Sequence, residues 1–455
     1  MSDLENICLP RRLGPFDQLL GVCVLVTVLA GCTSPAPTGS HYPMTSEAAS
    51  TEVLARSSPR FASGGPNADE YGASKAYPIG SSSTFDQISF HVGSYSHLDR
   101  IFEGRLIRRA TVPSRLERAS VEPAIRYEYE GRSLTLDDYL ARNPATGLLV
   151  AHQDTILVER YQYSRHERHR LTSWPMAKTI TAMLIGVAIA EGHIRSVDDA
   201  AETYVPGLVG TEYGRTPLKH LLQMSSGVSF AEQGSDVDRL AAETFHQHSP
   251  GGVHTVKPYN DRERPSGAKF SYSSADAQVL GLVLRRATGR PLADYLQEKI
   301  WEPIGAEGDA TWLIDRSGQE VTFCCINAIL RDFARLALLL AHDGQWRGRQ
   351  IIPATWIADA TRVRGDQPHL RPGSAPQWRA TATRCGSFRA TGECLPCLAG
   401  AGNRSWSIQA TDSSWFTQRF DETQAIRGTE TRCLRCGKAS YARWTAEPRT
   451  HARVP

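Results

Sequence analysis

Lys178 is the residue of this sequence whose surroundings most favour chemistry. It is the lone charged side chain in the apolar stretch 176–190, which a glycine follows at position 192. The pattern predicts a helix that is buried on most of its faces and stops where glycine favours a helix C-terminus. A single cation on such a helix faces a pocket more often than solvent, so Lys178 is a candidate catalytic or binding residue. The alternative is a solvated lysine at the helix end.

Two pairs of cysteines near the C-terminus have the spacing of a metal site. Cys394 and Cys397 form one C-x-x-C pair, and Cys433 and Cys436 form another. Paired thiolates at this spacing can hold zinc. The stretch between the pairs is longer than in a usual zinc ribbon, and few apolar residues are present to fold around a metal. We therefore expect no metal and no other cofactor, with a zinc module as the alternative that metal analysis would reveal.

Two further clusters have plainer explanations. The stretch 165–170 (RHERHR) mixes both signs of charge and repeats no ligand spacing. This favours a solvated loop over a metal or phosphate site. Cys324 and Cys325 lie in an apolar context, and we expect them to fill the core rather than to form a disulfide.

The overall charge argues against one class of partner. The 455 residues carry 51 basic and 48 acidic side chains, which gives a formal net charge of +3. Because no large field of one sign is available, we expect no nucleic-acid partner.

The first 32 residues have the layout of an export signal. Arg11 and Arg12 precede an apolar run over 19–30, which is too short to span a bilayer comfortably and is followed by no stop-transfer charges. The run closes on Leu-Ala-Gly before Cys32, which resembles the bacterial lipobox, whose cysteine becomes the acylated first residue. We expect 1–32 to be a lipoprotein signal peptide with Cys32 lipidated. An uncleaved membrane anchor is the alternative.

Lipidation would tie the body of the protein to a membrane on the periplasmic side of a bacterial cell envelope. The residues after the cysteine resemble the outer-membrane default of Gram-negative lipoproteins. Residues 33–83 are rich in Ser, Pro, Gly, Ala and Thr without a sustained apolar period, so we expect a disordered tether. Residues 84–145 have weak periodicity and are expected to form an approach segment that packs onto the main domain.

The body begins with strands and continues with helices. Apolar runs at 147–151 and 155–161 surround a short polar break, which predicts a β-hairpin. Apolar spacing predicts further helices over 217–224, 275–288, 294–300 and 327–342. A hairpin before a mostly helical stretch favours a sheet flanked by helices over a βαβ repeat.

Several separated motifs then point to a family. After the hairpin come LTSWPMAKTITAMLIG, HLLQMSSGVSF, KFSYSSADAQVLGLVL and FCCINAILRDFARLALLLAHDGQWRGRQIIP. In this order they resemble the serine β-lactamase and penicillin-binding-protein superfamily, and within it the 6-aminohexanoate-dimer hydrolases and related esterases. The resemblance implies an α/β (α+β) fold of β-lactamase/transpeptidase type, with an antiparallel sheet flanked by helices and a helical insert. We place this domain at 146–376.

The resemblance also implies a nucleophilic serine three residues before a lysine, and this chain lacks it. The lysine maps to Lys178, whose amine would take the hydroxyl proton one helical turn away. Position 175 holds Pro175. Proline suits the first turn of a helix, but it also removes a backbone N–H that would donate to the oxyanion, a donor worth roughly 100- to 1000-fold in rate. Ser173 is expected to lie outside the helix with the wrong reach to replace the nucleophile.

A second motif implied by the resemblance maps to Tyr272-Ser273-Ser274, directly before a predicted helix. Its phenol would relay a proton between nucleophile, lysine and leaving group. Taken alone, Tyr272 would be an amphipathic residue at a strand end, but the neighbouring motifs favour the catalytic interpretation. A third motif, Lys or His followed by a small residue and glycine, has no convincing match.

Residues 377–455 form an atypical tail. Its few Ile, Leu and Val residues are scattered without period, too sparsely to build core strands. We expect the C-terminal strands of the fold to be missing or altered, and a reading-frame change near residue 376 is our hypothesis, which resequencing the gene would test.

Two functions follow from these observations. In the first, the chain is a serine-hydrolase scaffold for amide or ester bonds, built for Ser-Lys-Tyr acylation but inactive because Pro175 replaces the serine. In the second, it is a non-catalytic envelope protein that binds a peptide, an amide oligomer or a cell-wall fragment. The fold alone cannot identify the ligand.

Overall fold

The computed structural model describes residues 58–129, 132–245, 249–362, 365 and 367–370, together with the backbone of four strands at 21–26, 405–411, 414–420 and 443–446. The predictions on Cys32 and on the two C-x-x-C pairs lie outside the described residues.

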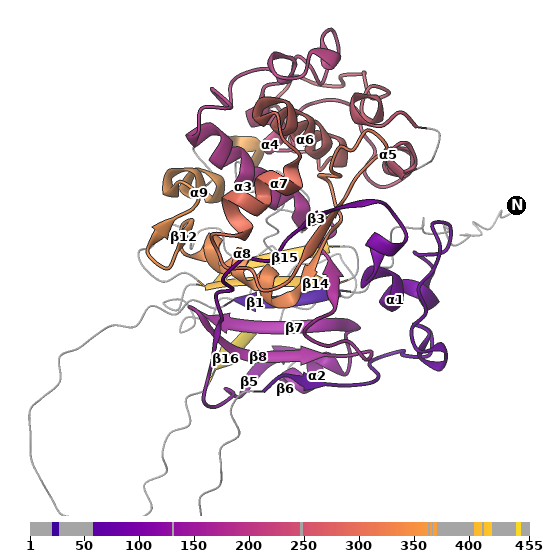
Figure 1. Cartoon of the computed structure of the whole chain (residues 1–455), viewed down its shortest axis with the longest axis vertical. Coiled ribbons are helices and arrows are strands. Elements are labelled where there is room, and N and C mark those ends of the chain that lie inside the picture. Colours follow the sequence, from indigo (N-terminus) through magenta and orange to yellow (C-terminus); the bar gives the residue numbers. More distant parts are fainter. Residues whose placement is uncertain are drawn as a thin grey trace, which may run out of the picture.

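A seven-stranded sheet lies at one end of the molecule (Figure 1). Its strands follow the order β15-β14-β1-β7-β8-β2, and β4 also pairs with β8. The predicted hairpin is confirmed as the antiparallel pair β7 (Ala145–His152) and β8 (Thr155–Tyr161). The short strands β2 (Arg60–Phe61) and β4 (Glu117–Arg118) pair parallel with β8.

Two strands of this sheet come from the tail. β14 (Ser405–Thr411) and β15 (Ser414–Phe420) pair antiparallel. The expectation that the tail is too poor in apolar residues to form strands is therefore wrong for these segments. Ile, Leu and Val are scarce there, but SWSIQAT and SWFTQRF also carry Trp, Phe and Thr, which favour strands as strongly.

A further strand of the seven-stranded sheet, β1, lies within the predicted export signal. β1 (Gly21–Val26) pairs parallel with β7 and antiparallel with β14. The run GVCVLV suits a buried strand as well as the apolar core of a signal peptide, because both need consecutive β-branched and aliphatic residues. A mature chain that keeps β1 in the sheet cannot have lost residues 1–32, so this pairing and the predicted cleavage exclude one another.

A second sheet connects the N-terminal part of the chain to the helical part. It has the order β3-β10-β11-β9, and all of its neighbours are antiparallel. Its strands are β3 (Gly104–Ile107), β10 (Ala310–Leu313), β11 (Ile326–Ile329) and β9 (Arg170–Thr172). A third sheet joins β16 (Arg443–Ala446), β5 (Ile125–Tyr129) and β6 (Arg132–Thr135), and the short α2 (Leu136–Leu140) follows it.

Most of the helices gather at the opposite end of the molecule from the hairpin (Figure 1). They include α3 (Met176–Ala190), α4 (Leu218–Leu222), α5 (Ser235–Phe245), α6 (Ser274–Thr288) and α7 (Leu292–Leu296), which a π-helical turn (Gln297–Trp301) continues. α8 (Leu330–Ala341) lies against β1, β7 and β14. The predicted helix over 327–342 begins too early, because its first residues belong to β11. The predicted α/β (α+β) fold, antiparallel sheets flanked by helices, is confirmed.

The described part of the predicted tether, residues 58–83, packs onto the main domain. Tyr71 and Tyr77 are 7% and 6% exposed and belong to the main hydrophobic core. Both rings pack edge-on against Tyr163, with centroids 5.6 and 5.9 Å away. The prediction of a disordered tether is therefore wrong from residue 58 onward. The average composition of the segment hides the two tyrosines, which supply the apolar area that orders it.

Cys324 and Cys325 are joined by a disulfide in the connection between β10 and β11. Both side chains are buried, as expected, but the prediction that they stay unbonded is wrong. Cys325 adopts a left-handed backbone conformation with φ 78°. This conformation turns the peptide so that two neighbouring side chains can meet, which a sequence pattern cannot reveal.

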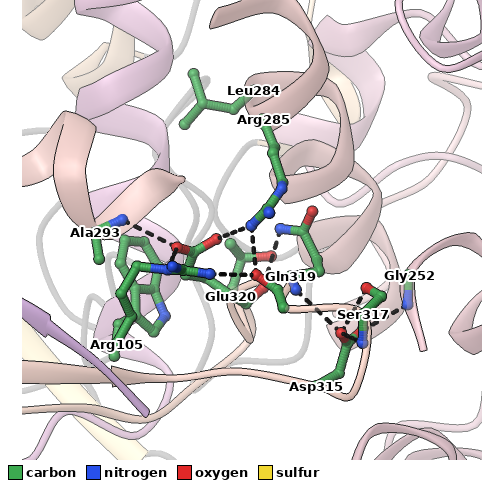
Figure 2. A network of polar contacts seen from close by, with 12 residues as sticks. Arg105, Gly252, Leu284, Arg285, Ala293, Asp315, Ser317, Gln319 and Glu320 are labelled. Carbon is green, nitrogen blue, oxygen red and sulfur yellow. Dashed lines mark hydrogen bonds and ion pairs between the residues drawn. The ribbon is translucent and has the colours of Figure 1, made fainter. Parts of the chain in front are cut away.

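A buried carboxylate ties the two halves of the domain together (Figure 2). Glu320 is fully buried and accepts hydrogen bonds from Arg105 of the second sheet and Arg285 of α6, each at 3.0 Å, and from the backbone of Ala293 in α7 at 3.2 Å. Nearby, Asp315 accepts from the backbone of Gly252 at 2.6 Å. Because removing any donor would leave a buried charge under-solvated, this network fixes the helices relative to the sheet.

Close packing fixes α3 against α9 (Ala354–Thr361). The indole nitrogen of Trp356 donates to the carbonyl of Ala182 at 3.0 Å. A Cβ atom on Gly186 would come within 2.4 Å of the same indole ring. Glycine is therefore required at this position so that the ring can lie against the helix backbone.

We predict that Gly186→Ala lowers the free energy of unfolding by about 1–3 kcal/mol, because the added methyl group overpacks the contact with Trp356. Chemical denaturation of the full chain measures this change. Gly64→Ala is the matched control, since its Cβ would meet only the side chain of Ala68, at 3.7 Å. Equal stability of the two variants would contradict the packing described here.

Candidate active site

The candidate site is built around the start of α3. Pro175 precedes the helix at its N-cap with φ −67° and ψ −6°, and its carbonyl accepts a hydrogen bond from the backbone of Lys178 at 3.0 Å. The residue before it, Trp174, has φ 42°, an unfavourable conformation for a side chain that precedes proline. Backbone strain of this kind is typical of functional sites, and the turn keeps it although no nucleophile stands at position 175.

Ser173 is committed to holding this turn in place. It is fully buried. Its hydroxyl donates to the carbonyl of Trp174 at 3.1 Å and accepts from the backbone N–H of Ile326 at 3.0 Å. These bonds tie the start of α3 to β11, which gives the hydroxyl a structural role.

Lys178 and Tyr272, the two residues that the motifs predict together, do meet. The Lys178 residue is 4% exposed, and its Nζ lies 3.8 Å from the centroid of the Tyr272 ring. A cation over an aromatic face is attracted by the negative face of the ring, and more strongly where water is excluded. The lysine therefore faces a pocket rather than solvent.

Two further polar residues contact the lysine, and no sequence pattern predicted a role for either of them. Lys178 Nζ donates to the hydroxyl of Ser274 at 3.1 Å and lies 3.8 Å from Oε1 of Glu232. Ser274 donates twice to that carboxylate, from its hydroxyl to Oε1 at 2.6 Å and from its backbone N–H to Oε2 at 2.7 Å. Ser274 stood within the tyrosine motif, but Glu232 comes from a loop without periodicity, and only the tertiary fold brings it here.

A small apolar cavity lies behind the amine. Its volume is ≈ 10 Å³, room for about one water molecule. Apart from Lys178, its lining is mostly aliphatic: Thr181, Ala182, Leu221, Leu222, Met224, Ala277 and Leu280. The hydroxyl of Thr181 donates to the carbonyl of Ala177 at 2.9 Å, and the other side chains of this wall are apolar. The charge of Lys178 is therefore balanced on the side of Glu232.

The first turn of α6 holds a buried acid. The Asp276 carboxyl is fully buried and accepts a hydrogen bond from the hydroxyl of Ser226 at 2.9 Å. Its backbone N–H donates to the N-cap residue, Ser273, at 3.0 Å. Burial raises the pKa of Asp276 to about 7, although the bond from Ser226 acts in the opposite direction. The helix that carries Ser274 is thus anchored by a carboxyl that is protonated over much of the acidic range.

The part of the chain that the structure describes contains no group of three or more His, Cys, Asp or Glu side chains placed to hold a metal ion. Within that same part, no helix combines the length and the apolar character needed to cross a membrane.

Comparison with known proteins assigns the scaffold. The model of the beta-lactamase family, described as "Beta-lactamase", matches residues 135–367, more than half of the chain. The chain belongs to the beta-lactamase family. The match includes Pro175, Lys178 and the tyrosine motif at Tyr272, so the candidate site lies inside the family domain.

Individual proteins resemble this chain at low sequence identity. The 6-aminohexanoate-dimer hydrolase of Paenarthrobacter ureafaciens is 26% identical over 265 residues, which cover 56% of this chain and 67% of that protein. A putative D-alanyl-D-alanine carboxypeptidase of Escherichia coli K12 is 21% identical over 244 residues, half of each chain. The solved structure of a putative 6-aminohexanoate-dimer hydrolase from Bacillus anthracis superposes with a TM-score of 0.59 at 20% identity and covers 71% of this chain and 86% of its own.

We predict that Asp276 makes the protein less stable as the pH rises from about 4 to about 7. Its pKa is 3.8 in the unfolded chain and about 7 in the folded one. The folded state therefore binds the proton more tightly, and the stability that this provides is present below pH 4 and is lost through pH 7. Asp276→Asn, which stays neutral, should flatten this slope in denaturation curves recorded between pH 4 and pH 8.

The control for this experiment is Asp137→Asn, at an exposed position, which should leave the slope unchanged. Some slope will persist in both variants, because burial also raises the pKa of Asp332, to about 6. A pH profile of Asp276→Asn that parallels that of the unmodified protein would contradict the assignment.

Proposed function

We propose that this chain keeps the scaffold and the lysine–tyrosine site of a serine hydrolase for amide or ester bonds but does not form an acyl-enzyme. The observation that supports this proposal is Pro175, placed directly before α3 and one helical turn ahead of Lys178. Proline has neither a hydroxyl to attack a carbonyl nor an N–H to donate to an oxyanion, so both contributions are lost at once.

The neighbouring hydroxyls do not supply a substitute. Ser173 is bonded to Trp174 and to Ile326. Ser274 is 4% exposed, and its hydroxyl and its N–H both donate to Glu232. A substrate carbonyl would have to displace these contacts before either serine became available.

A second function is non-catalytic binding of a small amide, ester or peptide-like ligand. The buried, paired lysine of the site supports it. Lys178 is buried, and it still contacts Tyr272, Ser274 and Glu232. A buried charge is costly unless it is paired, so these contacts keep the pocket ordered without catalysis. The names of the relatives suggest amide and peptide bonds as the ligand chemistry.

We predict that the unmodified chain is not labelled by a fluorescent β-lactam and gives no burst with a p-nitrophenyl ester. Pro175→Ser should restore labelling and raise the acylation rate by at least about 100-fold, since it returns the nucleophile together with its N–H. Serine readily adopts the backbone angles of Pro175.

Pro175→Ala is the matched control, because it restores the N–H without the hydroxyl and should stay unlabelled. Circular dichroism on each variant verifies the fold. Covalent labelling of the unmodified chain at the turn before α3 would refute the proposal.

We also propose that the protein is exported and held at the bacterial envelope as a lipoprotein, supported by the lipobox-like ending before Cys32. Intact mass spectrometry should find a mature chain that begins with a diacylated or triacylated Cys32. Cys32→Ser should abolish incorporation of labelled palmitate in a bacterial host. A mature chain that retains residues 1–31 would instead agree with β1 as a permanent strand of the sheet.

A further inference from the structure

We propose that Lys178, Ser274 and the ring of Tyr272 form a binding site for a carboxylate group, which the side chain of Glu232 fills in this structure and which a ligand carboxylate fills in its place. This inference rests on the proposed binding role and names the ligand chemistry: an organic acid, such as a free C-terminal carboxylate of a peptide or amide oligomer.

The groups around Glu232 are those that recognise a carboxylate. Its two oxygens accept from the hydroxyl and the N–H of Ser274, at 2.6 and 2.7 Å, and the ammonium of Lys178 lies 3.8 Å away. The N–H belongs to the first residue of α6, a helix of 15 residues, whose positive end favours an anion. A hydroxyl, a helix N–H and a buried cation thus converge on one carboxylate.

The side chain of Glu232 is more exposed than that of Lys178, so the carboxylate is the partner that a ligand can replace. The side chain of Lys178 is 2% exposed, whereas that of Glu232 is 17% exposed. The lysine lies on a buried helix, but Glu232 reaches in from the loop between Phe230 and α5. The carboxylate therefore lies on the solvent side of the cation, and it can leave without opening the hydrophobic core.

Exchange of one carboxylate for another preserves the charge balance and the hydrogen bonds of the pocket. A ligand carboxylate would take over both hydrogen bonds from Ser274 and the charge of Lys178, while Glu232 returns to water. A neutral ligand would leave the buried ammonium without an anion, which is strongly unfavourable. Selection for the charged group follows from the buried position of Lys178.

The experiment removes the carboxylate of Glu232 and measures whether acetate binds in its place. Glu232→Ala should lower the melting temperature of the full-length protein, and sodium acetate should restore it and bind in calorimetry. Acetamide, the neutral isostere, and sodium chloride at equal ionic strength should do neither. Glu232→Ala/Lys178→Met should lose the response to acetate. The unmodified protein should bind acetate at least about tenfold more weakly than Glu232→Ala, because its own side chain competes.

Acetate binding that is equal in Glu232→Ala and the unmodified protein, or equal rescue by acetamide, would overturn the proposal. If Glu232→Ala does not fold, Glu232→Gln takes its place, and it should bind acetate more tightly than the unmodified protein. Failure of both variants to fold would show that Glu232 is a structural residue and would also overturn the proposal. Since acetate binding requires no acylation, these outcomes are independent of the labelling test on Pro175.

Discussion

The charge of Lys178 is the constraint on which the candidate site depends. α3 is apolar along its length, and the amine has an aliphatic wall behind it. A cation in such a position persists only with compensating partners. Glu232, Ser274 and Tyr272 come from a loop, from a helix start and from the segment before it, and the fold must bring all three to the lysine. The arrangement of these three segments in the helical part of the domain thus depends on one ammonium group.

Other polar contacts fix the position of the lysine relative to the second sheet. Ser173 joins the start of α3 to β11 through its hydroxyl, and Glu320 joins the second sheet to α6 and α7. The first contact fixes the turn that carries Pro175, and the second fixes the helix that carries Ser274. Both are buried, so their loss would leave unsatisfied groups and would displace the two sides of the site relative to one another.

Elements could be predicted from the sequence where the local residue pattern and the packing in the fold favour the same structure. The hairpin, α3 and α6 have strong periodicity, and the order of the motifs was sufficient to bring Lys178 and Tyr272 together. Glu232 could not be found, because a loop carboxylate has no pattern until the fold positions it. The disulfide of Cys324 and Cys325 depends on one left-handed backbone angle, and the ordered segment after residue 58 depends on two tyrosines within an otherwise polar composition. In each case a long-range contact overrode the local signal.

The conformation of Pro175 has a consequence for substitutions at this position. Its angles, φ −67° and ψ −6°, are ones that serine adopts without strain, so the turn needs no rebuilding to accept a serine. In the genetic code, every proline codon becomes a serine codon when its first base changes from cytosine to uracil. A single transition at this codon is therefore sufficient to place a serine, with its hydroxyl and its N–H, directly before α3.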